Sequence, residues 1–162
     1  MYTSLLELLS ALDGVSQDRR YHPEGDALYH SLQVFQLAQR ETGDRVLWAA
    51  ALLHDVGKAV SSSDHDEVGA DLLDGLVCPR VVWLVRHHLD LLRNPGATKR
   101  KLRNTKALVD LGKLRRWDVG GRSPTAWVHT PSDALSILLN GDLTNLSPSG
   151  DAAYFHDEQE VQ

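Results

Sequence analysis

Residues 44–58, DRVLWAAALLHDVGK, have the pattern of an amphipathic helix that ends in a histidine–aspartate pair. Asp44 is a favourable N-cap residue. Apolar side chains then recur at the spacing of one helix face: Val46, Leu47, Ala50 and Leu53. His54 falls on this same face, so the pattern predicts a helix that continues to Gly57 and carries an imidazole into the core.

The same helical spacing recurs along the rest of the chain, and no stretch alternates with period two for long enough to predict a strand. Ser4 and Glu7 have the spacing of a capping box, and Asp13-Gly14 predicts the end of the first helix. The expected helices cover about 4–12, 26–41, 44–57, 64–76, 79–92 and 131–139, with one bent or two short helices over 98–117. The sequence therefore predicts an all-α protein, a single bundle of six to seven helices.

With 42% apolar and 24% charged residues, the 162-residue chain has the composition of one globular domain rather than of a disordered tail. Its one cysteine, Cys78, excludes a disulfide scaffold and a cysteine-rich zinc site. No run approaches the ~18 apolar residues of a membrane span, and the N-terminus has no basic leader, so we expect a cytoplasmic protein with no membrane partner. We expect a domain over residues 1–145 and a flexible acidic tail over 146–162.

Charge is unevenly distributed along the chain. The formal net charge is −5, which argues against a general nucleic-acid scaffold. Residues 93–122, however, contain ten basic residues against only Asp110 and Asp118. This segment could attract an anionic ligand such as RNA, and a solvated helix face explains it equally well.

Three of the eight histidines, His30, His54 and His88, lie on apolar helix stripes and are therefore expected to point into the core. A buried imidazole needs a hydrogen bond or a metal. Each histidine alone is more often a satisfied core residue, but the three together with Asp55 form a candidate metal cluster. Imidazole and carboxylate ligands suit Mn, Fe, Co, Ni or Zn.

The stretch ALLHDVGK, residues 51–58, resembles the signature of the HD superfamily of metal-dependent phosphohydrolases. His30 upstream and Asp118 downstream, in LRRWDVGGR, complete a similar H…HD…D order. The resemblance spans about residues 20–125 and is closest to the HD domains of bacterial tRNA nucleotidyltransferases. No strand-rich segment with paired acids precedes residue 20, so we expect a stand-alone HD domain without CCA-adding activity.

The resemblance implies a set of metal ligands. The first ion is assigned to His30, His54, Asp55 and Asp118. Asp110 is the rival for the fourth position, but GGR follows Asp118 as in the family pattern, and Asp110 is expected to cap or to pair with a base. A second ion, bridged by Asp55, would use His65 and one of the neighbours His87 and His88, and the sequence does not decide between these two.

The resemblance also implies a reaction, because a metal that lowers the pKa of water produces hydroxide near neutral pH for attack on a phosphate ester. Asp55 and Lys58 are the expected catalytic residues, and Lys58, Arg86 and Arg122 are candidates for binding the phosphate. For each of these cations a surface-charge explanation stands beside the functional one. The expected substrate is a small phosphate ester or a nucleotide.

Two further residues, His22 and Glu24, flank Pro23 in a loop before the second helix. They could line the site, but a turn with capping acids explains them without a function.

Two other functions remain open at this stage. The first is a di-iron oxygenase, because inositol oxygenase and its relatives share this ligand order. The second is a regulatory module that binds a nucleotide or RNA without turnover. The sequence does not predict the oligomeric state.

Overall fold

The computed structural model describes residues 1–151. Within this range the chain forms nine α-helices and one 3₁₀ helix, and its only β feature is an isolated bridge between Ser16 and Asp26. The elements are α1 (Tyr2–Ser10), α2 (Ala27–Glu41), α3 (Arg45–Leu53), η1 (Val56–Ala59), α4 (His65–Leu73), α5 (Pro79–His87), α6 (Asp90–Arg93), α7 (Pro95–Lys101), α8 (Lys106–Gly120) and α9 (Pro131–Leu139). The all-α prediction is confirmed.

Helices α2 and α3 form the centre of the domain, and side-chain caps fix where both begin. The carboxylate of Asp26 accepts a hydrogen bond from the Tyr29 N–H, and that of Asp44 accepts one from the Val46 N–H. Each cap satisfies an N–H group that the first helical turn leaves without a partner. Both starts agree with the sequence prediction.

Several helix boundaries differ from the prediction. The first helix begins at Tyr2 with Met1 as its N-cap residue, so Ser4 does not start a capping box. The predicted 79–92 helix breaks at His88, which caps α5 before the short helix α6 begins. Pro95 starts α7, because proline is tolerated in a first helical turn, and Thr105 then caps α8. These breaks divide the expected six to seven helices into nine.

Helix α3 also ends earlier than predicted, at Leu53, and the HDVGK segment turns into η1. The reason is a close approach between η1 and α4. A Cβ atom built on Gly57 would overlap the carbonyl of His65 and lie 2.7 Å from the N atom of Gly69, which is too close for any side chain. Only glycine allows this crossing.

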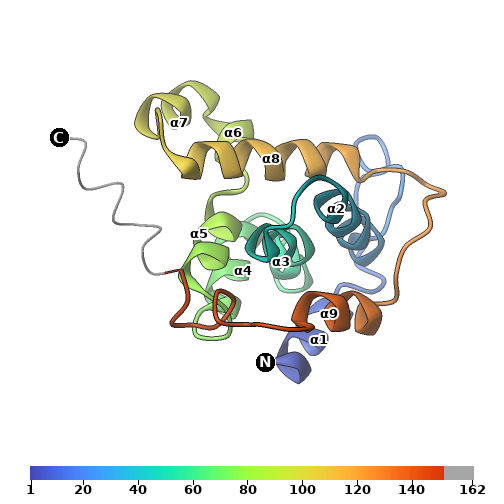
Figure 1. Cartoon of the computed structure of the whole chain (residues 1–162). Helices are drawn as coiled ribbons and strands as arrows, with labels where there is room; N and C mark the ends of the chain where they lie inside the picture. The colour runs from blue at the N-terminus through green and yellow to red at the C-terminus, as the bar shows by residue number, and fades with distance from the viewer. Residues whose placement is uncertain (152–162) are drawn as a thin grey trace.

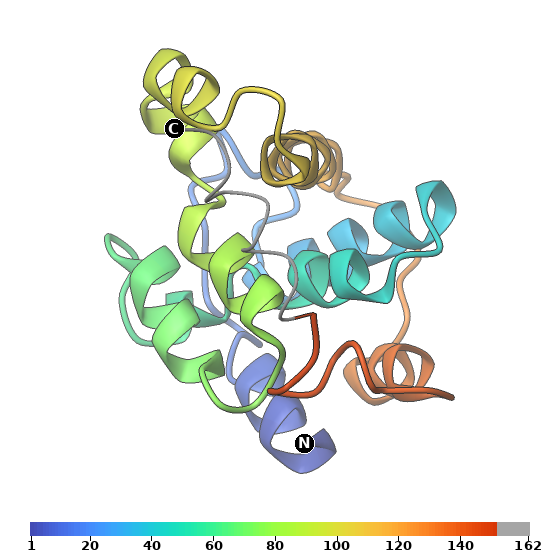
Figure 2. The same cartoon turned by 60° about the vertical axis from the view of Figure 1, so that its left-hand side comes forward.

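The helices pack in layers around the α2–α3 pair. Figure 1 shows α8 lying across one side of this pair, while α1 and α9 lie together on the opposite side. Figure 2 shows α4 beside α5 on a further side. The ends of α3 and α5 and the start of α4 therefore meet the interior faces of α2 and α8.

Two apolar clusters fill the domain. One joins α1, α4, α5 and α9 to α2, and the other packs α8 against α2 and α3, with Trp48 contacting both. Leu146 is buried in the first cluster, and Asp151 forms an ion pair with Arg80, so the packed domain extends to the last described residue. The remainder of the predicted acidic tail, 152–162, lies outside the described residues. Within residues 1–151 we find no helix that could serve as a membrane-spanning segment.

The contact at Gly57 makes a prediction about stability. Gly57→Ala is expected to lower the free energy of unfolding by about 3 kcal/mol, because the new methyl group meets the backbone of α4 and cannot move aside. Urea denaturation measures this change. Gly112→Ala is the matched control, because Gly112 lies inside α8 with open space around it and should gain about 0.5–1 kcal/mol from higher helix propensity. Equal effects of the two substitutions would contradict the steric argument.

Candidate metal centre

Side chains from five helices meet in the interior of the domain, and all of them are buried. We call this set the His–Asp cluster: His30 of α2, His54 and Asp55 after α3, His65 at the start of α4, His88 at the end of α5, and Asp118 in the last turn of α8. The imidazoles contact one another in a chain, with ring centroids 5.2–5.3 Å apart. Packing of helix ends thus assembles ligand-type side chains that are up to 88 residues apart in the chain.

For three of the four imidazoles, a hydrogen bond to a carbonyl three residues earlier in the chain fixes the orientation of the ring. The Nδ1 atom of His54 donates to the carbonyl of Ala51, and that of His88 donates to Val85. His65 does the same with the carbonyl of Ser62, again three residues earlier in the chain. A carbonyl oxygen can only accept, so Nδ1 carries the proton and Nε2 points into the cluster.

His30 reaches the same orientation by a different route. Its Nδ1 atom donates to the carbonyl of Gly121 at 2.8 Å, and Oε1 of Glu24 lies 3.0 Å from the same nitrogen. Its Nε2 atom faces Oδ1 of Asp118 at 3.0 Å. All four imidazoles therefore present Nε2 to the carboxylates.

The two oxygens of Asp55 face different sets of nitrogens. Oδ2 lies 3.4 Å from Nε2 of His54 and 3.8 Å from Nε2 of His30. Oδ1 lies 3.3 Å from Nε2 of His65 and 3.7 Å from Nε2 of His88. We call His30, His54, Asp55 and Asp118 the first group, and Asp55, His65 and His88 the second group.

Both groups have the chemistry of a metal site. The ligand atoms of His30, His54 and Asp55 lie within 4.8 Å of one another, and so do those of Asp55, His65 and His88. The Nε2 atoms of His54 and His88 are buried and have no hydrogen-bond partner. Because Nδ1 of each ring donates to a backbone carbonyl, Nε2 is the atom that faces a carboxylate oxygen, and it does so without a hydrogen bond. A divalent ion would give each of these Nε2 atoms a partner, so the residues present fit one.

The carboxylates of the cluster are ionised near neutral pH. Burial would raise the pKa of Asp55, but the neighbouring His54 and Lys58 hold it well below its ordinary value. Burial would likewise raise the pKa of Asp118, but the hydrogen bond from His30 holds it low. Two buried negative charges are thus available as ligands.

The histidines respond to these charges in opposite ways. Burial would lower the pKa of His30, but hydrogen bonding to Asp118 and Glu24 raises it to about 9. For His88, burial dominates over the attraction of the nearby Asp55 carboxylate and lowers the pKa. A metal bound by the first group would therefore replace a proton on His30, whereas the low pKa of His88 leaves that ring neutral without a metal.

Cationic side chains surround the cluster. The Nζ atom of Lys58 lies 2.7 Å from Oδ2 of Asp55. The guanidinium groups of Arg115 and Arg122 lie 3.3 Å and 3.9 Å from oxygens of Asp118. Lys58 and Arg122 were candidates from the sequence, and Arg115 was not. Arg115 lies three residues before Asp118 in α8, and residues at this spacing share one face of a helix.

Two candidate residues lie outside the cluster. The ring of His87 packs on the indole of Trp83, and its Nδ1 atom pairs with Asp90 at 2.8 Å. The guanidinium of Arg86 is held by two carboxylates of α4, Glu67 and Asp71. Of the neighbours His87 and His88, the structure brings only His88 to Asp55.

Asp110, the rival to Asp118, also lies elsewhere. Its carboxylate forms a buried ion pair with Arg80 at 2.8 Å, and the same guanidinium contacts Asp44 at 2.7 Å. This pairing with a base agrees with the expectation for Asp110.

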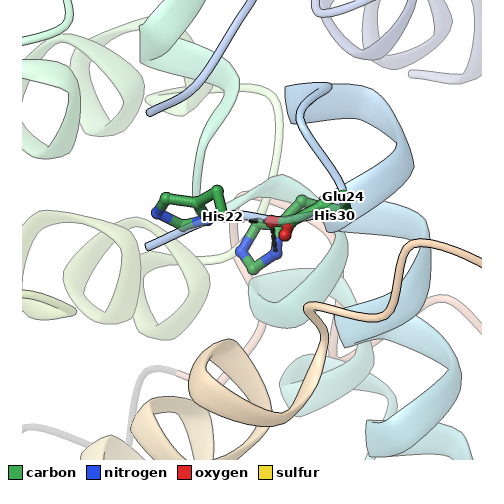
Figure 3. Close-up of side chains that lie close together, drawn as sticks. All are labelled: His22, Glu24 and His30. Carbon is green, nitrogen blue, oxygen red and sulfur yellow. Dashed lines mark hydrogen bonds and ion pairs between the residues drawn. The ribbon is translucent and has the colours of Figure 1, made fainter. Parts of the chain in front are cut away.

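The loop before α2 contributes residues that sequence reasoning set aside. Figure 3 shows the carboxylate of Glu24 beside the rings of His22 and His30. Oε1 of Glu24 lies 2.8 Å from Nδ1 of His22 and 3.0 Å from Nδ1 of His30, and the Glu24 side chain is fully buried. These three form no separate metal site, because Nδ1 of His30 already donates to Gly121. Glu24 instead fixes the ring orientation of His30 from behind.

Part of the basic segment is used in ion pairs. Arg93 pairs with Asp66, and Arg116 pairs with Glu41, whose carboxylate also accepts from the indole of Trp117. These contacts fasten the 93–122 segment to α2 and α4. Other cations of α7 remain exposed: Lys99, Arg100 and Lys101.

Segments of known proteins are similar to part of this chain. Similar segments occur in proteins named "Multifunctional CCA protein" from Halorhodospira halophila, with 39% identity over 57% of this chain, and from Methylobacillus flagellatus, with 32% identity over 68%. A third, from Thioalkalivibrio sulfidiphilus, is 37% identical over 44% of this chain. The matched segments span only 27%, 32% and 19% of these relatives.

The family comparison covers more than half of the chain. The family model described as "HD domain" matches residues 27–120, a range that contains His30, the His54–Asp55 pair and Asp118. This range runs from the first residue of α2 to the last residue of α8. The chain belongs to the HD domain family.

Proposed function

We propose that this chain is a metal-dependent phosphohydrolase that cleaves a phosphomonoester or a phosphodiester. The observation that carries the proposal is the pair of buried, unpartnered Nε2 atoms on His54 and His88, which face the ionised carboxylate of Asp55. Membership of the HD domain family supports the same reading, because this superfamily consists largely of metal-dependent phosphohydrolases.

The first group would hold one divalent ion, and the second group would hold another through the shared carboxylate of Asp55. Imidazole and carboxylate ligands favour Mn, Fe, Co, Ni or Zn. Such an ion lowers the pKa of water and so supplies a nucleophile near neutral pH. The protein contributes two ionised carboxylates, four oriented imidazoles and a buried setting that strengthens electrostatic interactions.

Lys58 and Arg122 would bind the phosphoryl oxygens. Negative charge on these oxygens grows during attack, so a cation beside them lowers the barrier. Lys58 is anchored by Asp55 at 2.7 Å, which keeps its ammonium group at the edge of the cluster. Arg122 is held by the Tyr21 carbonyl at 3.0 Å and lies next to Asp118.

We assign the substrate to the nucleotides or to the phosphate ends of RNA. The cluster includes Asp118 of α8, a helix with more basic than acidic residues, and phosphate esters are anions. The relatives carry the name CCA protein, which refers to a nucleotide sequence. A reaction on a free nucleotide and one on an RNA end share the same phosphoryl chemistry.

The first prediction concerns activity. His54→Ala and Asp55→Ala are expected to remove bound metal and all metal-dependent hydrolysis, because each takes away a ligand of the first group. The measurements are elemental analysis of protein purified without chelator and a panel of phosphate esters with added Mn, Co, Ni or Zn. His87→Ala is the matched control and should keep both metal and activity, because its ring lies on Trp83. Activity that survives loss of His54 and Asp55 would overturn the proposal.

The second prediction separates the two aspartates of α8. Asp118→Asn is expected to weaken metal binding with little loss of stability. Asp110→Ala is expected to retain the metal but to lower the free energy of unfolding by about 3–5 kcal/mol, because it leaves the buried charge of Arg80 with one partner fewer. Metal titration and urea denaturation of both variants check this. The reverse pattern would make Asp110 the ligand.

The third prediction concerns the support behind His30. Glu24→Ala is expected to weaken metal affinity by about 10–100-fold, because Nδ1 of His30 loses one of its two acceptors. Glu24→Gln keeps an acceptor oxygen and should restore most of the affinity. Glu7→Ala, which removes an exposed carboxylate of α1, is the control. Equal metal affinity in all four proteins would exclude a supporting role for Glu24.

A further inference from the structure

A cavity of about 220 Å³ lies beside the His–Asp cluster, on the side of Lys58. Its walls come from the loop that follows α1, from η1 and from the segment after η1: Val15, Ser16, Gln17, Asp18, His22, Lys58 and Ser62. Lys58 contacts Asp55 on one side of this wall, and His22 contacts Glu24 on the other. The cavity therefore lies next to Lys58, which contacts the ligand Asp55, and next to His22, whose partner Glu24 supports the ligand His30.

The backbone fixes the loop that carries Gln17. Ser16 and Asp26 form a β-bridge, and the N–H of Gln17 donates to the carbonyl of Gly25 at 2.9 Å. The N–H of Ala27 donates back to the carbonyl of Val15 at 2.9 Å. Segment 15–17 is thus paired with the chain that leads into α2, which places the side chain of Gln17 against Lys58.

Lys58 decides which way the amide of Gln17 faces. The ammonium group can only donate, and it contacts Oε1 of Gln17 at 2.5 Å. The Nε2 atom of Gln17 is therefore the other end of the amide. This atom is buried and has no hydrogen-bond partner among the described residues. An unpartnered buried donor is costly, so a missing acceptor is expected at this position.

The other polar groups of the wall do not supply that acceptor. The carboxylate of Asp18 is engaged by the guanidinium and the backbone N–H of Arg20. Lys58 has three N–H donors, of which Asp55 and Gln17 each take one. The wall thus offers spare donors from Gln17 and Lys58, and an oxyanion is the ligand that matches them.

We propose that Gln17 is a binding residue for the phosphoryl group of the substrate, with Nε2 donating to a phosphoryl oxygen beside the ammonium of Lys58. The inference rests on the proposed hydrolase function and deepens it, because it makes this cavity the phosphate subsite. Gln17 has two separate tasks in this arrangement. Its Oε1 atom holds Lys58, and its Nε2 atom contacts the ligand directly.

A double-mutant cycle with inorganic phosphate as the probe separates these tasks. Phosphate binding to the Mn²⁺-loaded protein is measured by calorimetry for the wild type, Gln17→Met, Lys58→Met and the double variant. Methionine has a similar length but has no N–H donor. Gln17→Met is expected to weaken phosphate binding about tenfold or more, as loss of a hydrogen bond to a charged group does. The same loss should appear in the Lys58→Met background.

The result that would overturn the inference is a Gln17→Met effect that disappears in the Lys58→Met background, because Gln17 would then act only by holding Lys58. An unchanged phosphate affinity in Gln17→Met would overturn it as well. Gln39→Met, the same change on α2 outside the cavity, is the control and should bind phosphate as the wild type does. Thermal unfolding checks that each variant is folded.

Metal content distinguishes this inference from the proposed function. A wild-type protein that binds neither Mn²⁺ nor phosphate contradicts both. A wild type that binds both, with a Gln17→Met variant of equal phosphate affinity, contradicts the subsite alone and leaves the hydrolase proposal standing.

Discussion

The buried carboxylate of Asp55 has to satisfy two sets of imidazole nitrogens at once, and the arrangement of the helices follows from this requirement. Its oxygens face His54 and His30 on one side, and His65 and His88 on the other. Such contacts need the end of α3, the start of α4 and the end of α5 at one point, against α2 and α8. Gly57 makes this possible, because it lets η1 cross α4 at backbone distance.

Much of this arrangement is predictable from local chemistry. Four helix starts are marked in the sequence by Asp26, Asp44, Pro79 and Pro131. The two aspartates accept hydrogen bonds from N–H groups of the first turn, and the two prolines fit there because they have no N–H group that needs a partner. The apolar stripe of α3 likewise predicts a buried His54. Such signals depend only on residues close by in the chain, so they can be recognised before the fold is known.

The remaining features depend on contacts that the chain order does not reveal. His87 and His88 are adjacent, and a rotation of about 100° per helical residue sends one to Trp83 and the other to Asp55. The apolar stripe of this helix favours His88 as the buried residue, but the contact of His88 with Asp55 follows only from the packing of α5 on α4. In the sequence, Glu24 has the pattern of an ordinary turn residue, and only the structure shows its contact with Nδ1 of His30. The ion pairs of Arg86 with two carboxylates of α4 likewise appear only once α5 is packed on α4.

The two halves of the cluster are electrostatically unequal, and this inequality has consequences for how they would work. The first group has two carboxylates, Asp55 and Asp118, whereas the second group has only its share of Asp55. A divalent cation would therefore be held more strongly by the first group, in which Glu24 also supports the ring of His30. The second group has two imidazoles and one carboxylate oxygen, which carry too little negative charge to balance a divalent cation. A phosphoryl oxygen would supply that charge, so occupation of the second group and binding of substrate should favour each other.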